Sequence, residues 1–260
     1  MAIETSTLLA LDFDGVICDG LLEYFQTSWR TYCKIWQPDS QTPPDNLANV
    51  FYHFRPVIEI GWEMPVLIRA LIKGVPETKI EIDWSLVAKD IIELDKLDPV
   101  AIGKEVDKTR DEWIATDLDG WLGLHQFYPG IIERLKQIVT SDKSTELFIV
   151  TTKEGRFVKQ LLQQQGIQLS EDRIIGKEIK RPKHQTLRQL SAQFPGKLWF
   201  VEDRLKTLQS VQEQPDLNQV RLFLADWGYN TKTQRDSVGD SSGIHLLSLS
   251  QFAQDFSLWH

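Results

Sequence analysis

Short apolar runs alternate with amphipathic stretches over much of the chain. Five runs have the length of a strand and few polar residues, a pattern typical of strands that are buried on both faces. They span residues 7–13, 146–152, 173–176, 197–202 and 219–225. The run at 173–176 is the shortest and the weakest. These runs predict the strands of a mostly parallel sheet.

Three amphipathic stretches between these runs have helical spacing. The stretch 129–139 begins with Pro129, which suits a first helical turn, and repeats apolar residues on one face. The stretches 155–166 and 183–194 show the same periodicity. Strands that alternate with helices of this length predict an α/β fold, with a Rossmann-like parallel sheet covered by helices on both faces.

Residues 21–125 have a different character. They contain helical patterns but no convincing buried strand, and they carry six of the nine tryptophans of the chain. This aromatic supply suggests a helical module with a core of its own. We therefore expect two domains: an α/β core formed by residues 1–20 and 126–260, and an inserted α-helical domain formed by residues 21–125.

Composition restricts the class of protein. The chain has 260 residues, 42% of them hydrophobic, and a net charge of −8, so it lacks the basic footprint of a nucleic-acid-binding protein. No apolar run is long enough to span a bilayer, and the N-terminal residues do not resemble a signal peptide. The two cysteines imply no disulfide framework. We expect a cytoplasmic protein that binds neither nucleic acid nor membrane and is a monomer or a weak homodimer.

Carboxylates follow two of the predicted strands. Asp12 and Asp14 come after the first run, with Gly15 permitting a tight exit, and Glu202 and Asp203 end the run at 197–202. Residues two apart on a strand point the same way, so Asp12 and Asp14 are expected to share one side while Phe13 faces the other. The carboxyl ends of parallel strands meet at one edge of a sheet, where ligands bind. Converging acids would repel each other, so the sequence predicts a Mg²⁺ site.

Groups that suit an anion stand beside these acids. Thr151 and Thr152 end the run at 146–152 and offer hydroxyl and backbone N–H donors. A lysine would complete the balance of charge. Lys177, Lys180 and Lys183 all precede the strand at 197–202, and their positions alone leave the choice among them open.

Four motifs in this order resemble those of the haloacid dehalogenase superfamily, in its branch with an inserted helical cap. The segments YPGI at 128–131 and DWGY at 226–229 also resemble that family's connecting segments. The resemblance covers roughly residues 7–20 and 125–250. The motifs are DFDGV at 12–16, an apolar strand ending in Thr151, a lysine within KRPKHQTL, and the acidic pair of FVEDR.

The resemblance implies roles for these residues. Asp12 would be the nucleophile and form an aspartyl-phosphate, while Asp14 would act as general acid and base. Mg²⁺ would be held by Asp12, Asp203, Glu202 and Asp14, the last through its backbone carbonyl. The phosphoryl group would be bound by Gly15, Thr151, Thr152 and Lys183.

The expected activity is therefore that of a Mg²⁺-dependent phosphatase acting on a small phosphorylated metabolite. Haloacid dehalogenases lack an acid at the position of Asp14, so its presence here favours a phosphate ester as substrate. Two alternatives remain. One is a phosphomutase with the same intermediate, and the other is a catalytically silent phosphate-binding module.

Several other features have simpler interpretations. A second DxDG at 117–120 follows no apolar run and is interpreted as a turn, and the residues after Asp12 do not fit a calcium loop. The aromatic stretch 51–62 favours core packing, and His53 within it is interpreted as a packing residue. Three basic residues of the inserted domain, Arg55, Arg69 and Lys73, would either reach an anionic substrate or lie on a solvated face.

Overall fold

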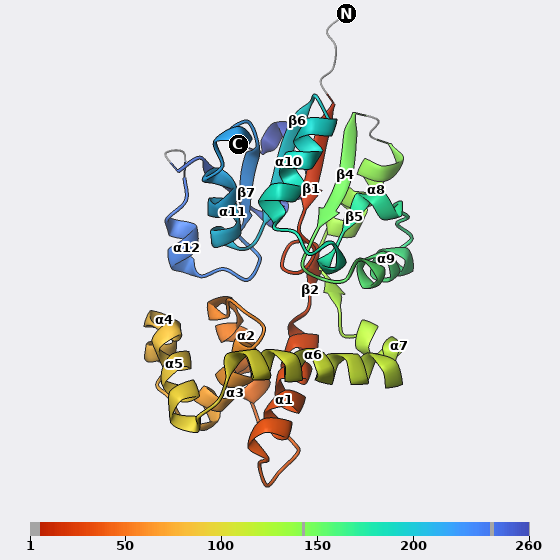
Figure 1. Ribbon diagram of the computed structural model, residues 1–260. Helices are drawn as coiled ribbons and strands as arrows, with labels where there is room; N and C mark the ends of the chain where they lie inside the picture. Colours follow the sequence, from red (N-terminus) through yellow and green to blue (C-terminus); the bar gives the residue numbers. More distant parts are fainter. Residues whose placement is uncertain (1–5, 142–143, 240–241, 260) are drawn as a thin grey trace, which may run out of the picture. The chain divides into compact units, whose positions relative to one another are not determined.

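The structure is a computed structural model that describes residues 6–141, 144–239 and 242–259 (Figure 1). The chain forms two compact units. Residues 1–19 and 126–260 make up the first, here called the α/β unit, and residues 20–125 make up the second, here called the helical unit.

A six-stranded sheet forms the centre of the α/β unit. Its strand order is β5-β4-β1-β6-β7-β8, and every neighbouring pair is parallel. This is the order 3-2-1-4-5-6 of a doubly wound fold, in which the direction of winding changes beside the first strand. The strands are β1 Thr7–Leu11, β4 Thr145–Val150, β5 Ile174–Ile175, β6 Lys197–Glu202, β7 Arg221–Ala225 and β8 Ile244–Leu247.

Helices connect the strands, and both faces of the sheet are buried. Leu8 and Ala10 of β1 belong to an apolar cluster with Leu187 and Leu208 from two of these helices. Leu9 and Leu11 point to the opposite face and are equally buried. The predicted α/β class is confirmed. The helices are α8 Ile131–Thr140, α9 Gly155–Gln164, α10 Lys183–Gln193, α11 Leu205–Gln212, α12 Lys232–Asp236 and α13 Leu249–Phe252, and the 3₁₀ turns are η2 Glu171–Arg173, η3 Lys177–Ile179, η4 Pro215–Leu217 and η5 Phe256–Leu258.

A short two-stranded ribbon stands at the two ends of the insertion. Strand β2 Cys18–Asp19 pairs antiparallel with β3 Gln126–Phe127, so that Asp19 lies opposite Gln126. The chain thus leaves and re-enters the α/β unit at neighbouring positions.

The helical unit has its own aromatic core. Phe51 and Phe54, from the aromatic stretch, are fully buried in it beside Phe25, which confirms that this stretch is mainly core. His53 is not a core residue: its side chain is 65% exposed and lies near Glu81, although its ring also contacts the Phe54 ring with the centroids 4.8 Å apart. The elements are α1 Leu21–Trp36, α2 Leu47–Phe54, η1 Arg55–Val57, α3 Glu63–Ile72, α4 Glu77–Ile82, α5 Trp84–Asp95, α6 Pro99–Thr116 and α7 Leu118–Leu122.

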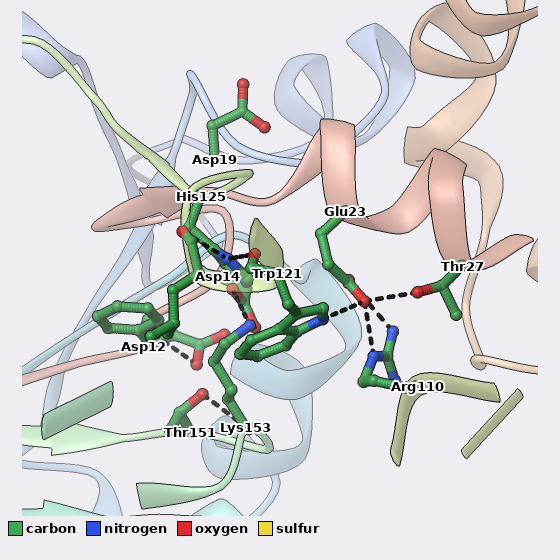
Figure 2. A network of polar contacts seen from close by, with 12 residues as sticks. Asp12, Asp14, Asp19, Glu23, Thr27, Arg110, Trp121, His125, Thr151 and Lys153 are labelled. Atoms are coloured by element: carbon green, nitrogen blue, oxygen red, sulfur yellow. Dashed lines mark hydrogen bonds and ion pairs between the residues drawn. The ribbon is translucent and has the colours of Figure 1, made fainter. Parts of the chain in front are cut away.

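A buried carboxylate joins three helices of this unit. Glu23 of α1 accepts hydrogen bonds from Thr27 Oγ1 at 2.7 Å, from Arg110 Nε of α6 at 2.7 Å and from Trp121 Nε1 of α7 at 3.1 Å (Figure 2). The burial of this charge is therefore compensated by an ion pair and two neutral donors.

The second DxDG is the start of a helix rather than a turn. Asp117 is the N-cap of α7, and its Oδ1 accepts a hydrogen bond from the backbone N–H of Gly120 at 2.9 Å. Within the described residues, no helix is both long enough and apolar enough to cross a membrane.

Candidate active site

The loop after β1 carries the first two acids. Strand β1 ends at Leu11, so the expectation that strand alternation aligns Asp12 with Asp14 is wrong. The backbone turns instead: the Phe13 carbonyl accepts from the N–H groups of Ile17 and Cys18, both at 2.9 Å. The orientation of Asp12 and Asp14 is therefore set by the loop and not by the alternation of side chains along a strand.

Three carboxylates converge at the carboxyl ends of β1 and β6. Asp12, Glu202 and Asp203 are all buried, and each offers an oxygen within 4.8 Å of the others. Both strands are central in the sheet, and the winding of the sheet changes direction between them. This is where a doubly wound fold opens a ligand site.

One lysine bridges two of these acids. The Nζ of Lys183, at the start of α10, lies 2.9 Å from Asp12 Oδ1 and 2.7 Å from Glu202 Oε2. Lys180, by contrast, is exposed and has left-handed backbone geometry. The geometry thus favours Lys183 among the three lysines that the sequence leaves open.

The cluster holds its protons more tightly than isolated acids do. Burial, and then the charge of Glu202, raise the pKa of Asp12 to about 7 despite the nearby Lys183. Burial also raises the pKa of Glu202 and that of Asp203. Burial by itself lowers the pKa of Lys183, but the charges of Asp12 and Glu202 raise it above its usual value.

Asp14 has a separate partner that the sequence analysis missed. The Nζ of Lys153 lies 3.2 Å from Asp14 Oδ1 and 3.3 Å from Oδ2 (Figure 2). Lys153 follows the Thr151–Thr152 pair, and the only signal for it in the sequence is a lysine three residues beyond an apolar strand. Lys183 thus contacts Asp12, and Lys153 contacts Asp14.

The two threonines differ in their surroundings. Thr151 is buried, and its Oγ1 accepts a hydrogen bond from the Lys153 backbone N–H at 3.2 Å, which leaves the hydroxyl proton available to a ligand. Its own backbone N–H donates to the Ile175 carbonyl at 3.0 Å, so the expectation that this N–H binds an anion is wrong. Thr152 is exposed.

Asp203 is fixed by the loop that follows β7. Its Oδ2 accepts from the Tyr229 backbone N–H at 2.8 Å, and its backbone carbonyl accepts from Asn230 Nδ2 at 3.0 Å. Gly15 has a φ of +85°, and a Cβ there would lie 2.2 Å from Asp203 Oδ2. The close approach of these two loops therefore requires glycine at position 15.

Two of the basic residues considered in the helical unit are already paired. Arg69 Nε and Lys73 Nζ each lie 2.8 Å from an oxygen of Asp95. Arg55 is buried, with its guanidinium carbon 4.6 Å from the centre of the Tyr24 ring. Arg55 is therefore interior, whereas Lys73 is exposed as the solvated-face interpretation expects, and Arg69 is half-buried.

Solved structures with the same fold come from several bacteria. A predicted phosphatase from Clostridium acetobutylicum is 16% identical, with a TM-score of 0.57 over 96% of this chain and 97% of that one. A predicted phosphoglycolate phosphatase from Haemophilus somnus is 14% identical, with a TM-score of 0.55 over 94% and 95%. A haloacid dehalogenase-like hydrolase from Streptococcus pneumoniae is 14% identical, with a TM-score of 0.53 over 94% of each chain.

The fold alone does not decide the reaction. A protein tyrosine kinase from Mycobacterium tuberculosis is 16% identical, with a TM-score of 0.53 over 95% of this chain and 96% of that one. Scans of protein-family models and of curated proteins give no match. The assignment of an activity therefore depends on the residues of the site.

Proposed function

The chain has the haloacid dehalogenase-like fold, and from its site we propose that it is a phosphatase that hydrolyses a small phosphorylated metabolite through an aspartyl-phosphate. One observation carries the proposal. The Asp12 carboxylate lies at the switch point of the sheet, between two further acids and a lysine, while a fourth acid, Asp14, is held separately by its own lysine.

The residues present fit a divalent metal ion. The donors are carboxylate oxygens, which Mg²⁺ prefers, and they are buried close to one another, so that burial and their mutual repulsion raise the pKa of Asp12. Four carboxylates beside two lysines leave a net charge of −2 when all are ionised. We propose that Asp12, Glu202, Asp203 and the backbone carbonyl of Asp14 hold Mg²⁺. When bound, the ion would neutralise the repulsion between a carboxylate nucleophile and a phosphate dianion.

Asp12 is the group we assign to the attack on phosphorus. Among the described residues, the donors that contact this side chain, Lys183 Nζ and the Phe13 N–H, both contact Oδ1. Oδ2 is then the oxygen that forms the bond to phosphorus, and the ester oxygen leaves with the electron pair of the broken bond. Lys183 holds the nucleophile in place, and the Thr151 hydroxyl donates to a phosphoryl oxygen.

Asp14 is the group we assign to both proton transfers. It gives a proton to the leaving oxygen in the first step. In the second step it accepts a proton from the water that attacks phosphorus, and inorganic phosphate leaves while the Asp12 carboxylate is restored. We further propose that the helical unit acts as a cap that excludes bulk water and selects the substrate, and that the reaction takes place in the cytosol.

The first experiment measures release of inorganic phosphate from a panel of phosphorylated metabolites, with and without Mg²⁺. We expect Mg²⁺-dependent turnover that is lost in Asp12→Asn, whose side chain keeps its shape but is no longer a nucleophile. Turnover that persists in Asp12→Asn would contradict the assignment of the nucleophile.

The same panel separates the two alternatives. Phosphate transfer that requires a sugar bisphosphate would identify a phosphomutase. Binding of Mg²⁺ without turnover on any ester would identify a silent phosphate-binding module.

A further inference from the structure

We propose that Lys153 is a positioning residue that holds the Asp14 carboxylate in the orientation from which it serves the leaving group. The inference rests on the proposed function and extends it to a residue to which the four motifs assign no role. Lys183 is already engaged by Asp12 and Glu202, so a second lysine is needed to hold the second acid.

The backbone of Lys153 is fixed on both sides of its side chain. Its N–H donates to Thr151 Oγ1 at 3.2 Å, and its carbonyl accepts from the Lys177 N–H at 3.0 Å. These contacts attach the loop after β4 to the strand end and to η3. The Lys153 side chain therefore extends from a backbone that is held by hydrogen bonds, and it is only 9% exposed.

The backbone of Asp14 is fixed as well. Asp14 forms an isolated bridge with Cys18, and the N–H of Gly15 donates to the Cys18 carbonyl at 2.8 Å. Its carboxylate is 17% exposed and accepts from Lys153 through both oxygens (Figure 2). Contact with both oxygens fixes the rotation of the carboxylate plane as well as its position.

Loss of the lysine would release this carboxylate. A partly buried carboxylate that has lost its cation lowers its free energy by turning toward water or toward another cation. Lys153→Met keeps the length and the apolar stem of the side chain but removes the ammonium group. The variant should therefore move the Asp14 carboxylate away from its place while leaving Asp12, Lys183 and the sheet unchanged.

The test compares two esters that differ in their need for a proton. The p-nitrophenolate of p-nitrophenyl phosphate leaves without help, whereas the alkoxide of an alkyl phosphate must be protonated as it leaves. General acid catalysis contributes roughly 10²–10⁴-fold. We expect Lys153→Met to lower kcat/KM for an alkyl phosphate by about 10-fold or more beyond its effect on p-nitrophenyl phosphate. Lys153→Arg should recover part of the difference.

Two further variants make the outcome specific. In an Asp14→Asn background, Lys153→Met should cause no additional selective loss, because the group that it positions is already absent. Lys159→Met is the matched control: it removes the surface ion pair between Lys159 of α9 and Glu171, and kcat/KM for both esters should stay unchanged.

Equal losses on the two esters, or none, in a folded Lys153→Met protein would overturn the inference, since Lys153 would then contact the phosphoryl group or have no part in the reaction. If Lys153→Met does not fold, Lys153→Arg decides the question, compared in the Asp14 protein and in the Asp14→Asn background: a selective loss on the alkyl phosphate in the first alone supports the inference, and equal losses or none overturn it. Failure of the wild type to hydrolyse either ester would instead contradict the proposed function itself.

Discussion

At the scale of single residues, Asp12 combines two demands that conflict. It must be ionised to attack phosphorus, yet burial and the neighbouring acids raise its pKa to about 7. Such shifts are characteristic of functional sites, because a chain that evolved for stability alone would avoid placing three acids together. A bound cation would relieve the conflict. Cation binding at this site can therefore be measured as an increase in the unfolding free energy.

The raised pKa of Asp12 predicts a pH-dependent stability. Because the folded-state pKa lies above the unfolded value of 3.8, the folded protein keeps a proton that the unfolded chain has released. The unfolding free energy should therefore fall as the pH rises from about 4 through 7. In metal-free buffer, the wild type should lose stability relative to Asp12→Asn between about pH 4 and pH 7.

Urea unfolding of both proteins at several pH values checks this expectation. Mg²⁺ should restore the wild type at the alkaline end, because a ligand of the folded state raises its stability. Parallel pH profiles for the two proteins would show that Asp12 does not carry the raised pKa.

Two of the candidate lysines, Lys183 and Lys180, can be told apart by substitution. Lys183→Met leaves Asp12 and Glu202 without their shared cation, so we expect a loss of kcat of about 10²-fold or more. Lys180→Met alters an exposed side chain and should change kcat by less than about twofold. Steady-state rates with the best ester of the panel provide the measurement, and a larger loss in Lys180→Met would reassign the role.

At the scale of elements, the loops after the strands matter more than the strands themselves. The loop after β1 approaches Asp203 so closely that no side chain fits at Gly15. The loop after β7 holds the same carboxylate through Tyr229. The positions of the acids thus depend on contacts between two loops that are far apart in the sequence.

Gly15→Ala tests this contact against a matched control. Gly74 also has a positive φ, of +69°, but a Cβ there meets nothing within 4 Å, so Gly74→Ala should cost only the strain of a left-handed residue, about 1–2 kcal/mol. Gly15→Ala adds a clash with Asp203 and should cost about 1–3 kcal/mol more. Urea unfolding gives both values, and equal costs would show that the loops separate without penalty.

Sequence patterns predicted the elements that are buried on both faces. Strands β1, β4, β6 and β7 fall on apolar runs, since a strand inside a parallel sheet must be apolar on both sides. The edge strand β5 was found because its two residues are both isoleucines. Strand β8, at the other edge, was missed because the half-buried His245 and the exposed Leu246 separate its buried ends and interrupt the apolar pattern. The ribbon β2–β3 has two residues in each strand, too few for any periodicity.

Site residues were predictable where they follow such a run. Asp12, Thr151, Glu202 and Asp203 stand at strand ends, and their convergence follows from the parallel sheet. Lys153 was missed because its partner lies in a different loop, and only the folded chain brings the two together. His53 was misjudged because aromatic neighbours in sequence lie on different faces of a helix.

At the scale of the whole molecule, we predict that the α/β unit folds without the helical unit, because the ribbon β2–β3 brings the two ends of the insertion together. Asp19 and Gln126 face each other across an antiparallel pair, so a two-residue Asn-Gly turn can join them in place of residues 20–125. The shortened chain should unfold cooperatively, and Mg²⁺ should still raise its Tm, because all the carboxylates of the cluster belong to the α/β unit. Thermal unfolding followed by circular dichroism measures both properties.

A broad transition without cooperativity would show that the α/β unit depends on the insertion for its stability. A cooperative transition that Mg²⁺ leaves unchanged would contradict the assignment of the metal site to this unit alone.

The central place of β1 in the sheet has a consequence for synthesis of the chain. Thr7 pairs with Thr145 on one side and with Lys197 on the other, so neither neighbour of this apolar strand is local. At roughly 5–20 residues per second, a ribosome needs about 10 s or more after making β1 before it delivers β6. During that interval the first strand is exposed to aggregation, and a cell has reason to shield it with a chaperone until the last of its partners has emerged.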